Sequence, residues 1–181
     1  MTPGLLKELH RAGAASLILP LVFPRYFFAL IWVAFTLLLE PINYRLGLRS
    51  LLRDLEEGDP RRLCQLLAGG LICGFLWEFW NFKAGAKWIY IVPLAGDIKL
   101  FEMPLAGYIG FPLFAVECYA MYNFISYIRR GRTWEQDSEQ EPGPKPALWL
   151  LIGAAALILV TYYTAATAID THTVRLYIAY L

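Results

Sequence analysis

Histidine is nearly absent from this chain, whose 181 residues contain only His10 and His172. That scarcity excludes a di-iron oxidase built on many histidines and a haem held by two intramembrane histidines. The three cysteines, Cys64, Cys73 and Cys118, form no C-x-x-C pair, so neither a disulfide framework nor a cysteine zinc site is predicted. The sequence also has no Gly-x-Ser-x-Gly elbow, no phosphate-cradling glycine loop and no paired aspartate-rich motifs. Serine hydrolysis, nucleotide chemistry and prenyl transfer are therefore not indicated, and no metal site is predicted.

Charge is also scarce. Asp, Glu, Lys and Arg make up 17% of the residues, against about 25% in ordinary soluble domains. Hydrophobic residues make up 58%, aromatic residues 15%, and the mean hydropathy is +0.47. The net charge of +1 implies no nucleic-acid partner. This composition predicts an integral membrane protein whose first partner is the lipid bilayer.

Long apolar runs set the expected architecture, because a membrane span needs about 20 mostly apolar residues. Pro20, Pro24 and Arg25 interrupt the first run, which is either one span or a hairpin. We expect an all-α helical bundle of about four transmembrane helices, forming one polytopic domain over residues 1–181. The four runs are Ala12–Leu39, Leu63–Phe82, Met103–Ile128 and Ala147–Ile169.

Two connecting segments stand out. Lys83–Glu102 contains the apolar run Trp88–Pro93, which is too short to span a membrane and is followed by several glycines and prolines. It predicts a re-entrant or interfacial segment between the second and third spans, because irregular backbone at membrane depth must be buried in protein or line a cavity. Residues 133–146 are acidic and rich in proline, which predicts a flexible loop.

Basic residues predict the orientation. The loops that follow the first and third spans together carry nine Lys and Arg residues, against six on the other side. This bias places both loops in the cytoplasm. Counting the first apolar run as one span puts both termini outside, whereas a hairpin would move the N-terminus inside.

Three carboxylates, Glu78, Glu102 and Glu117, lie in or beside apolar, aromatic stretches. A charged side chain at the bilayer centre costs at least about 2.5–3.5 kcal/mol, so an intramembrane acid marks a candidate functional site. We therefore take all three as candidate catalytic groups. Glu102 precedes Met103-Pro104 and has a structural alternative, which is to cap the third span.

Glu78 and Asn81 are three residues apart, so they share one helix face, with Trp77 and Trp80 beside them. The alternative is that Glu78 marks the outer end of the span, at the headgroup level, with Lys83 or Lys87 as its partner. The preceding Gly70-x-x-x-Gly74 spacing is typical of close helix packing.

Glu117 falls near the middle of its span, where no basic residue lies nearby in sequence. Its partner must come from another span or from water, or the carboxyl is neutral and able to donate a proton. Arg25 is the natural counter-charge, with snorkelling to an interface as its alternative. We expect Arg25, Glu78, Asn81 and Glu117 to form one polar cluster.

Acids surrounded by aromatic side chains could catalyse the protonation of a polyene, or could bind an apolar ligand without reaction. Protonation of a polyene needs a carboxylic acid in a dry pocket, and the resulting carbocation is stabilised by aromatic faces. Candidate ligand-binding residues are Arg25, Trp77, Trp80, Asn81, Tyr108 and Tyr119. The same residues would bind a carotenoid, quinone or lipid without chemistry, or would pack against other subunits of a membrane complex.

A block of motifs over roughly residues 20–125 resembles a family of small polytopic inner-membrane proteins of bacteria. Its elements are Phe23-Pro-Arg25, Glu40-Pro-Ile-Asn-Tyr-Arg-Leu-Gly47, Trp77-Glu-Phe-Trp-Asn81, Lys87-Trp-Ile-Tyr-Ile-Val-Pro93, Lys99-Leu-Phe-Glu-Met-Pro-Leu-Ala-Gly-Tyr-Ile-Gly-Phe-Pro112 and Phe114-Ala-Val-Glu-Cys-Tyr119. The resemblance implies a location in the bacterial inner membrane and no particular reaction.

A more distant similarity is to the membrane lycopene cyclases, whose signature is a Pro-x-Glu-Glu type motif. Here Phe101-Glu-Met-Pro104 has the proline and the acid in reverse order and lacks the second acid. The sequence therefore predicts a membrane-embedded site for a hydrophobic isoprenoid or lipid-like ligand, with acid catalysis as an extension. The alternative is a non-catalytic structural subunit of a larger bacterial membrane complex. No cofactor is identified.

Overall fold

The computed structural model describes residues 1–90, 98–131, 133 and 147–179, with the backbone alone for residue 150 and residues 168–179. The described chain is mainly helical, with one small two-stranded antiparallel sheet that the all-α expectation did not include. All but the first residue of the predicted flexible loop, and part of the run Trp88–Pro93, lie outside the described residues. The elements in order are α1 (Pro3–Val22), α2 (Pro24–Phe27), η1 (Phe28–Leu30), α3 (Ile31–Arg45), α4 (Leu51–Glu56), α5 (Arg61–Lys83), β1 (Lys99–Leu100), β2 (Met103–Pro104), η2 (Leu105–Ile109), α6 (Gly110–Arg130) and α7 (Leu148–Ala179).

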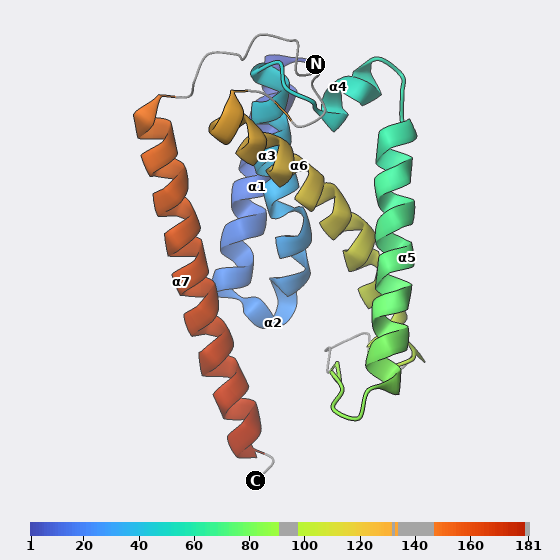
Figure 1. Ribbon diagram of the computed structural model, residues 1–181. Helices are drawn as coiled ribbons and strands as arrows, with labels where there is room; N and C mark the ends of the chain where they lie inside the picture. Colours follow the sequence, from blue (N-terminus) through green and yellow to red (C-terminus); the bar gives the residue numbers. More distant parts are fainter. Residues whose placement is uncertain (91–97, 132, 134–146, 180–181) are drawn as a thin grey trace.

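The first apolar run is a helical hairpin and not a single span (Figure 1). α1 ends at Val22, and Pro24 begins the next helical turn, where a proline is tolerated because its missing amide hydrogen would have no helical partner. α3 then returns along α1. A Cβ on Gly13 would lie 2.9 Å from the backbone nitrogen of Leu38, so the two helices touch closely.

The hairpin fixes where the N-terminus lies. The ammonium group of Met1 forms an ion pair with Glu56 of α4 and lies 3.1 Å from the Tyr44 hydroxyl oxygen. Met1 is therefore at the same end of the molecule as the loop that follows α3. The last turns of α7 lie at the opposite end (Figure 1). The expectation that both termini share a side is wrong, because it counted the hairpin as one span.

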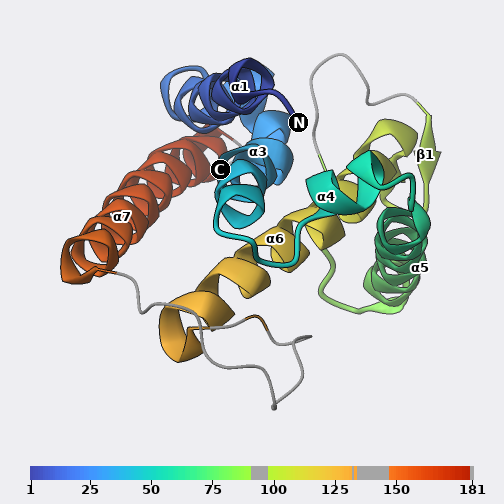
Figure 2. The ribbon, with the colours of Figure 1, turned by 90° about the horizontal axis from the view of Figure 1, so that it is seen from above.

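The helices pack in the order α1, α3, α6 and α5, with α6 crossing at an angle between α3 and α5 (Figure 2). Gly70 and Gly74 are the contact points between α5 and α6. A Cβ on Gly74 would lie 2.4 Å from the Phe111 ring, and one on Gly70 would lie 2.6 Å from the carbonyl oxygen of Phe111. The Gly-x-x-x-Gly spacing therefore serves helix packing, as its residue pattern predicts.

Three helices of the described chain are long and apolar enough to cross a membrane: Pro24–Arg45, Arg61–Lys83 and Leu105–Arg130. A helix of 23 residues, as in α5, is about 35 Å long, which exceeds the roughly 30 Å of a bilayer core. The predicted fourth span corresponds to α7, whose described apolar stretch, Leu151–Thr167, is shorter. Large apolar side chains remain exposed on these helices, including Ile72 at 60% and Leu159 at 68%.

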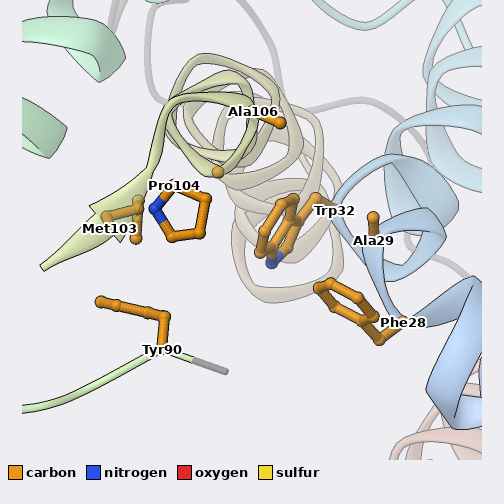
Figure 3. A pocket seen from close by; sticks show the side chains of 8 residues that line it. Phe28, Ala29, Trp32, Tyr90, Met103, Pro104 and Ala106 are labelled. Atoms are coloured by element: carbon orange, nitrogen blue, oxygen red, sulfur yellow. The ribbon is translucent and has the colours of Figure 1, made fainter. Parts of the chain in front are cut away.

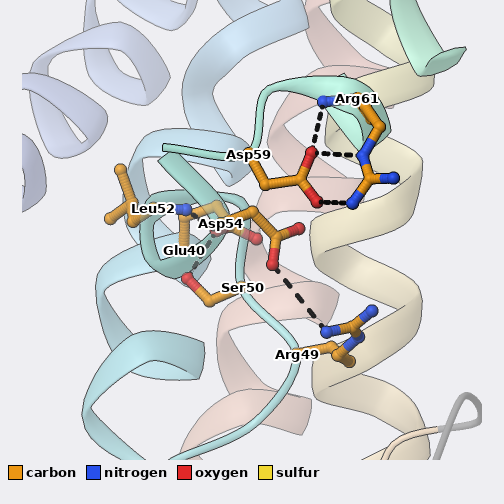
Figure 4. Close-up of polar contacts among 7 residues, drawn as sticks. All are labelled: Glu40, Arg49, Ser50, Leu52, Asp54, Asp59 and Arg61. Atoms are coloured by element: carbon orange, nitrogen blue, oxygen red, sulfur yellow. Dashed lines mark hydrogen bonds and ion pairs between the residues drawn. The ribbon is translucent and has the colours of Figure 1, made fainter. Parts of the chain in front are cut away.

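The loop between α3 and α5 is held by polar contacts of its own (Figure 4). Asp59 Oδ2 lies 2.7 Å from Arg61 Nη2, and Asp59 Oδ1 lies 2.8 Å from Arg61 Nε. These bonds stabilise the charged carboxylate and lower the pKa of Asp59 to about 2. Gly58 has a φ of +78°, a conformation that glycine adopts without strain. The short helix α4 and this turn carry the chain from α3 to α5.

Candidate functional site

Glu78 of α5 is an acidic residue in an apolar sequence, and its side chain is completely buried (0% exposed). The Tyr90 hydroxyl donates a 2.7 Å hydrogen bond to Glu78 Oε1, and Asn81 Nδ2 lies 3.5 Å from Glu78 Oε2. The alternative with a lysine partner is wrong. Lys87 forms an ion pair with Glu102, and the Lys83 ammonium lies near the Phe82 ring.

Asn81 explains why Tyr90 reaches Glu78. Its Nδ2 donates to the Trp88 carbonyl oxygen at 2.8 Å, and its Oδ1 accepts from the Trp88 amide at 2.7 Å. Both ends of the side-chain amide therefore hold the backbone of the segment that follows α5. This contact folds the chain back beside the last turn of α5 and places Tyr90 next to the Glu78 carboxyl.

Burial and the adjacent Glu78 carboxylate raise the pKa of the Tyr90 hydroxyl. The indole of Trp77 acts in the opposite direction with a smaller effect. Tyr90 therefore keeps its proton throughout the physiological range and acts as a fixed hydrogen-bond donor to Glu78.

The chain between Lys99 and Pro104 forms a tight hairpin against the same end of α5. Lys99 pairs with Pro104 and Leu100 with Met103, so Phe101 and Glu102 form the turn. Phe101 has a φ of +59°, which is uncommon for a bulky residue. Its ring packs against three phenylalanine rings of α5, at centroid distances of 5.5, 6.0 and 5.5 Å from Phe75, Phe79 and Phe82. These contacts hold the hairpin tip against α5.

Three adjoining hollows lie between α3, α5, α6 and this hairpin, and we call them the aromatic groove. The inner hollow has a volume of about 340 Å³, the middle one about 280 Å³ and the outer one about 610 Å³. Figure 3 shows Tyr90, Met103 and Pro104 facing Trp32 and Phe28 across the inner hollow. The inner and middle hollows share Trp32, Tyr90, Met103 and Gly107, and the middle and outer ones share Trp77, Phe111 and Phe114.

The aromatic groove is suited to an apolar molecule. Its described walls are mostly aromatic, aliphatic or glycine residues, with Met103 as a flexible thioether. Tyr90 supplies a polar atom near the inner end, and Gln65 supplies one at the outer end. Ligand sites in proteins typically have volumes of about 300–1,000 Å³ and a few polar groups in mainly apolar walls. The hollows fall in this range.

Glu117 of α6 is 3% exposed and has a partner on another helix. Its Oε1 accepts a 2.8 Å hydrogen bond from the main-chain amide of Phe35 on α3. The prediction that Glu117 finds a polar partner on another span is confirmed. The predicted single cluster does not form among the described contacts, since none of them joins Glu117 or Arg25 to Glu78. Arg25 is exposed, and its guanidinium lies 5.8 Å from the centre of the Tyr26 ring.

Glu102 is held by Lys87, whose Nζ lies 2.5 Å from Glu102 Oε1. It does not cap the third span, because the residue before η2 is Pro104 and no side chain caps that turn. The pair joins the segment after α5 to the hairpin. Among the described residues, none of the three candidate acids lines the aromatic groove.

The four aromatic residues predicted to bind a ligand differ in their position relative to the aromatic groove. Trp77 lines the middle and outer hollows, whereas Trp80 is 63% exposed and lines none of the three. Tyr108 is buried and donates a 3.1 Å hydrogen bond to the Leu100 carbonyl oxygen. Tyr119 lies in the core cluster with Leu51 of α4 and Val116 of α6, and it lines none of the three hollows.

Several site residues were not predicted from the sequence. Trp32, Tyr90, Met103 and Phe111 line the groove, and Glu40 is a third buried acid beside Glu78 and Glu117. Glu40 ends an apolar run that begins at Ile31, which is the same signal that identified Glu117. The aromatic and methionine positions carry no such signal, because apolar residues are common throughout the chain.

No family model, curated protein or solved structure matches this chain. Among the described residues, no group of three or more His, Cys, Asp and Glu residues is placed to hold a metal ion.

Proposed function

We propose that this chain is a multi-pass membrane protein whose aromatic groove binds a hydrophobic, isoprenoid or lipid-like molecule. The observation that carries the proposal is the groove itself, with adjoining hollows of about 340, 280 and 610 Å³ and mainly apolar described walls. Carotenoids, quinones and lipids share this chemistry. The location that we propose is the bacterial inner membrane, with the loops after α3 and α6 in the cytoplasm, as the basic residues predict.

The arrangement supports binding better than acid catalysis. A catalytic acid must reach the reacting atom, and no candidate acid lines the groove among the described residues. Tyr90 does line it, but its pKa is raised, so it gives up its proton less readily than an ordinary tyrosine. The catalytic roles of Glu78, Glu102 and Glu117 stay predictions. In binding, Tyr90, held in place by its bond to Glu78, would orient a polar end of the ligand.

Filling the inner hollow tests this proposal. Ala29 lines that hollow, so Ala29→Phe places a ring where the ligand would lie. The full chain in detergent is titrated with all-trans-retinol as an isoprenoid probe and with cis-parinaric acid as a lipid-like probe, each followed by its own fluorescence. We expect the dissociation constant of each probe to rise at least tenfold in this variant, which corresponds to a loss of about 1.4 kcal/mol in binding free energy.

Ala68→Phe is the matched control, because Ala68 is exposed on α5 and lines none of the three hollows. It should bind both probes as tightly as the unchanged chain. Loss of one probe only would identify the ligand class. If neither probe binds the unchanged chain, or if Ala29→Phe binds both with full affinity, the groove is not a binding site. The alternative, a structural subunit of a membrane complex, would then be favoured.

A further inference from the structure

A row of polar side chains runs along the face of α3 that packs against α6. Thr36, Glu40 and Asn43 are spaced by four and three residues along α3, so they share one helix face. Asn43 Nδ2 donates a 3.0 Å hydrogen bond to the Ala120 carbonyl oxygen of α6, which places this face against α6. Asn123 lies three residues after Ala120 and is completely buried.

Five atoms of this row are buried without a hydrogen-bond partner among the described residues. They are Thr36 Oγ1, Glu40 Oε1, Asn43 Oδ1, Asn123 Nδ2 and Asn123 Oδ1. Glu40, Asn43 and Asn123 are themselves 3%, 0% and 0% exposed. An unpaired buried polar group costs about 1–3 kcal/mol, and native proteins leave few of them. Such a concentration in one interface needs an explanation.

The chemistry of these atoms indicates what satisfies them. An amide nitrogen of Asn123 only donates, the carbonyl and carboxylate oxygens only accept, and the Thr36 hydroxyl does both. A metal cation would satisfy the oxygens and leave the Asn123 nitrogen unpaired. Water both donates and accepts, and buried water typically makes about three hydrogen bonds to such groups.

We propose that the interface between α3 and α6 holds bound water that connects Glu40, Asn43 and Asn123 and extends through Thr36 toward Glu117. Glu40 marks the loop end of this row, because its Oε2 accepts from the Ser50 hydroxyl at 2.9 Å and from the Leu52 amide at 3.2 Å (Figure 4). Glu117 marks the inner end, because it bonds the amide of Phe35, the residue before Thr36.

The sign of a stability change tests the proposal. In a dry interface, Asn123→Leu and Thr36→Val remove unpaired polar atoms at nearly constant shape, so both should leave the melting temperature equal or raise it. In a hydrated interface, each removes hydrogen bonds to water and leaves that water short of partners. We expect both variants of the full chain in detergent to melt lower by about 2–4 °C or more.

Two references accompany these variants. Thr164→Val gives the background effect of the same exchange, because Thr164 Oγ1 bonds the Val160 carbonyl of its own helix. Asn43→Leu loses its bond to Ala120 in either case, so it shows that the assay detects a lost contact. Melting at or above the unchanged chain for either Asn123→Leu or Thr36→Val overturns the proposal.

A direct measurement does not depend on stability. Water-selective nuclear magnetic resonance transfers magnetisation from water to nearby amide protons. Bulk water does not reach Asn123, which is 0% exposed. We expect a cross-peak between water and the side-chain amide protons of Asn123 in the unchanged chain. A clear Asn123 amide signal without that cross-peak overturns the proposal, independently of whether the aromatic groove binds a ligand.

Discussion

Glu117 Oε1 on α6 accepts a 2.8 Å hydrogen bond from the main-chain amide of Phe35 on α3. The bond joins two helices that pack against each other, and it gives a buried acid a fixed partner. Because an amide donor serves a carboxylate or a neutral carbonyl oxygen equally well in geometry, this contact does not require a charged Glu117.

Two substitutions of Glu117 should show whether its stabilising effect comes from the hydrogen-bond acceptor or from the charge. Glu117→Gln keeps an oxygen acceptor, so we expect its stability to stay within about 1 kcal/mol of the unchanged chain. Glu117→Leu leaves the Phe35 amide without that acceptor and should lose about 1–3 kcal/mol. Melting in detergent gives both values, with the exposed replacement Ile125→Val on the same helix as the control. Equal stability of Glu117→Leu and Glu117→Gln would contradict the bond.

Tyr90→Phe should loosen the segment that follows α5. The substitution keeps the ring in the groove and removes only the hydroxyl that donates to Glu78 Oε1 at 2.7 Å. A buried acceptor that loses its donor costs about 1–3 kcal/mol. A double-mutant cycle with Glu78→Leu, which removes the acceptor, isolates the pair, and Tyr26→Phe, at an exposed tyrosine, is the control. Additive losses for the two substitutions would show that the pair is not coupled.

Gly74→Ala should destabilise the contact between α5 and α6. The added Cβ would lie 2.4 Å from the Phe111 ring, which is closer than carbon atoms pack, so one helix must shift. Overpacking of this kind costs typically about 1–3 kcal/mol. Gly69→Ala on the same helix is the matched control, because a Cβ there meets nothing within 4 Å. We expect Gly69→Ala to melt at or above the unchanged chain; the reverse order would refute this packing.

The topology can be tested by cysteine labelling in intact cells. Single cysteines at Gly4, Glu57 and Gly85 are introduced into a chain whose three native cysteines are replaced. Because Met1 contacts Glu56, positions 4 and 57 should react from the same side, whereas position 85 should react from the other. Basic residues place the first two in the cytoplasm, so an impermeant reagent should label Gly85→Cys alone. Labelling of Gly4→Cys without Glu57→Cys would exclude the hairpin.

The sequence by itself determined the class of the protein and part of the site. Apolar runs of about 20 residues predict helices long enough to cross a membrane. The expected stretches Leu63–Phe82 and Met103–Ile128 correspond to such helices, and the first stretch contains only the first part of a third. Acids in apolar runs identified Glu78 and Glu117, which are both buried and hydrogen-bonded. The Gly70-x-x-x-Gly74 spacing identified a helix contact. These features are local, because composition and spacing along one helix decide them.

Only the tertiary structure decided which residues meet. The partner of Glu78 is Tyr90, because Asn81 holds the backbone of Trp88 and turns the chain back toward α5. Glu117 bonds α3 and does not join Arg25, because the first apolar run folds as a hairpin. Partners of a buried polar atom depend on crossing angles and side-chain reach between segments far apart in the sequence. Hydropathy along the chain carries no information about either.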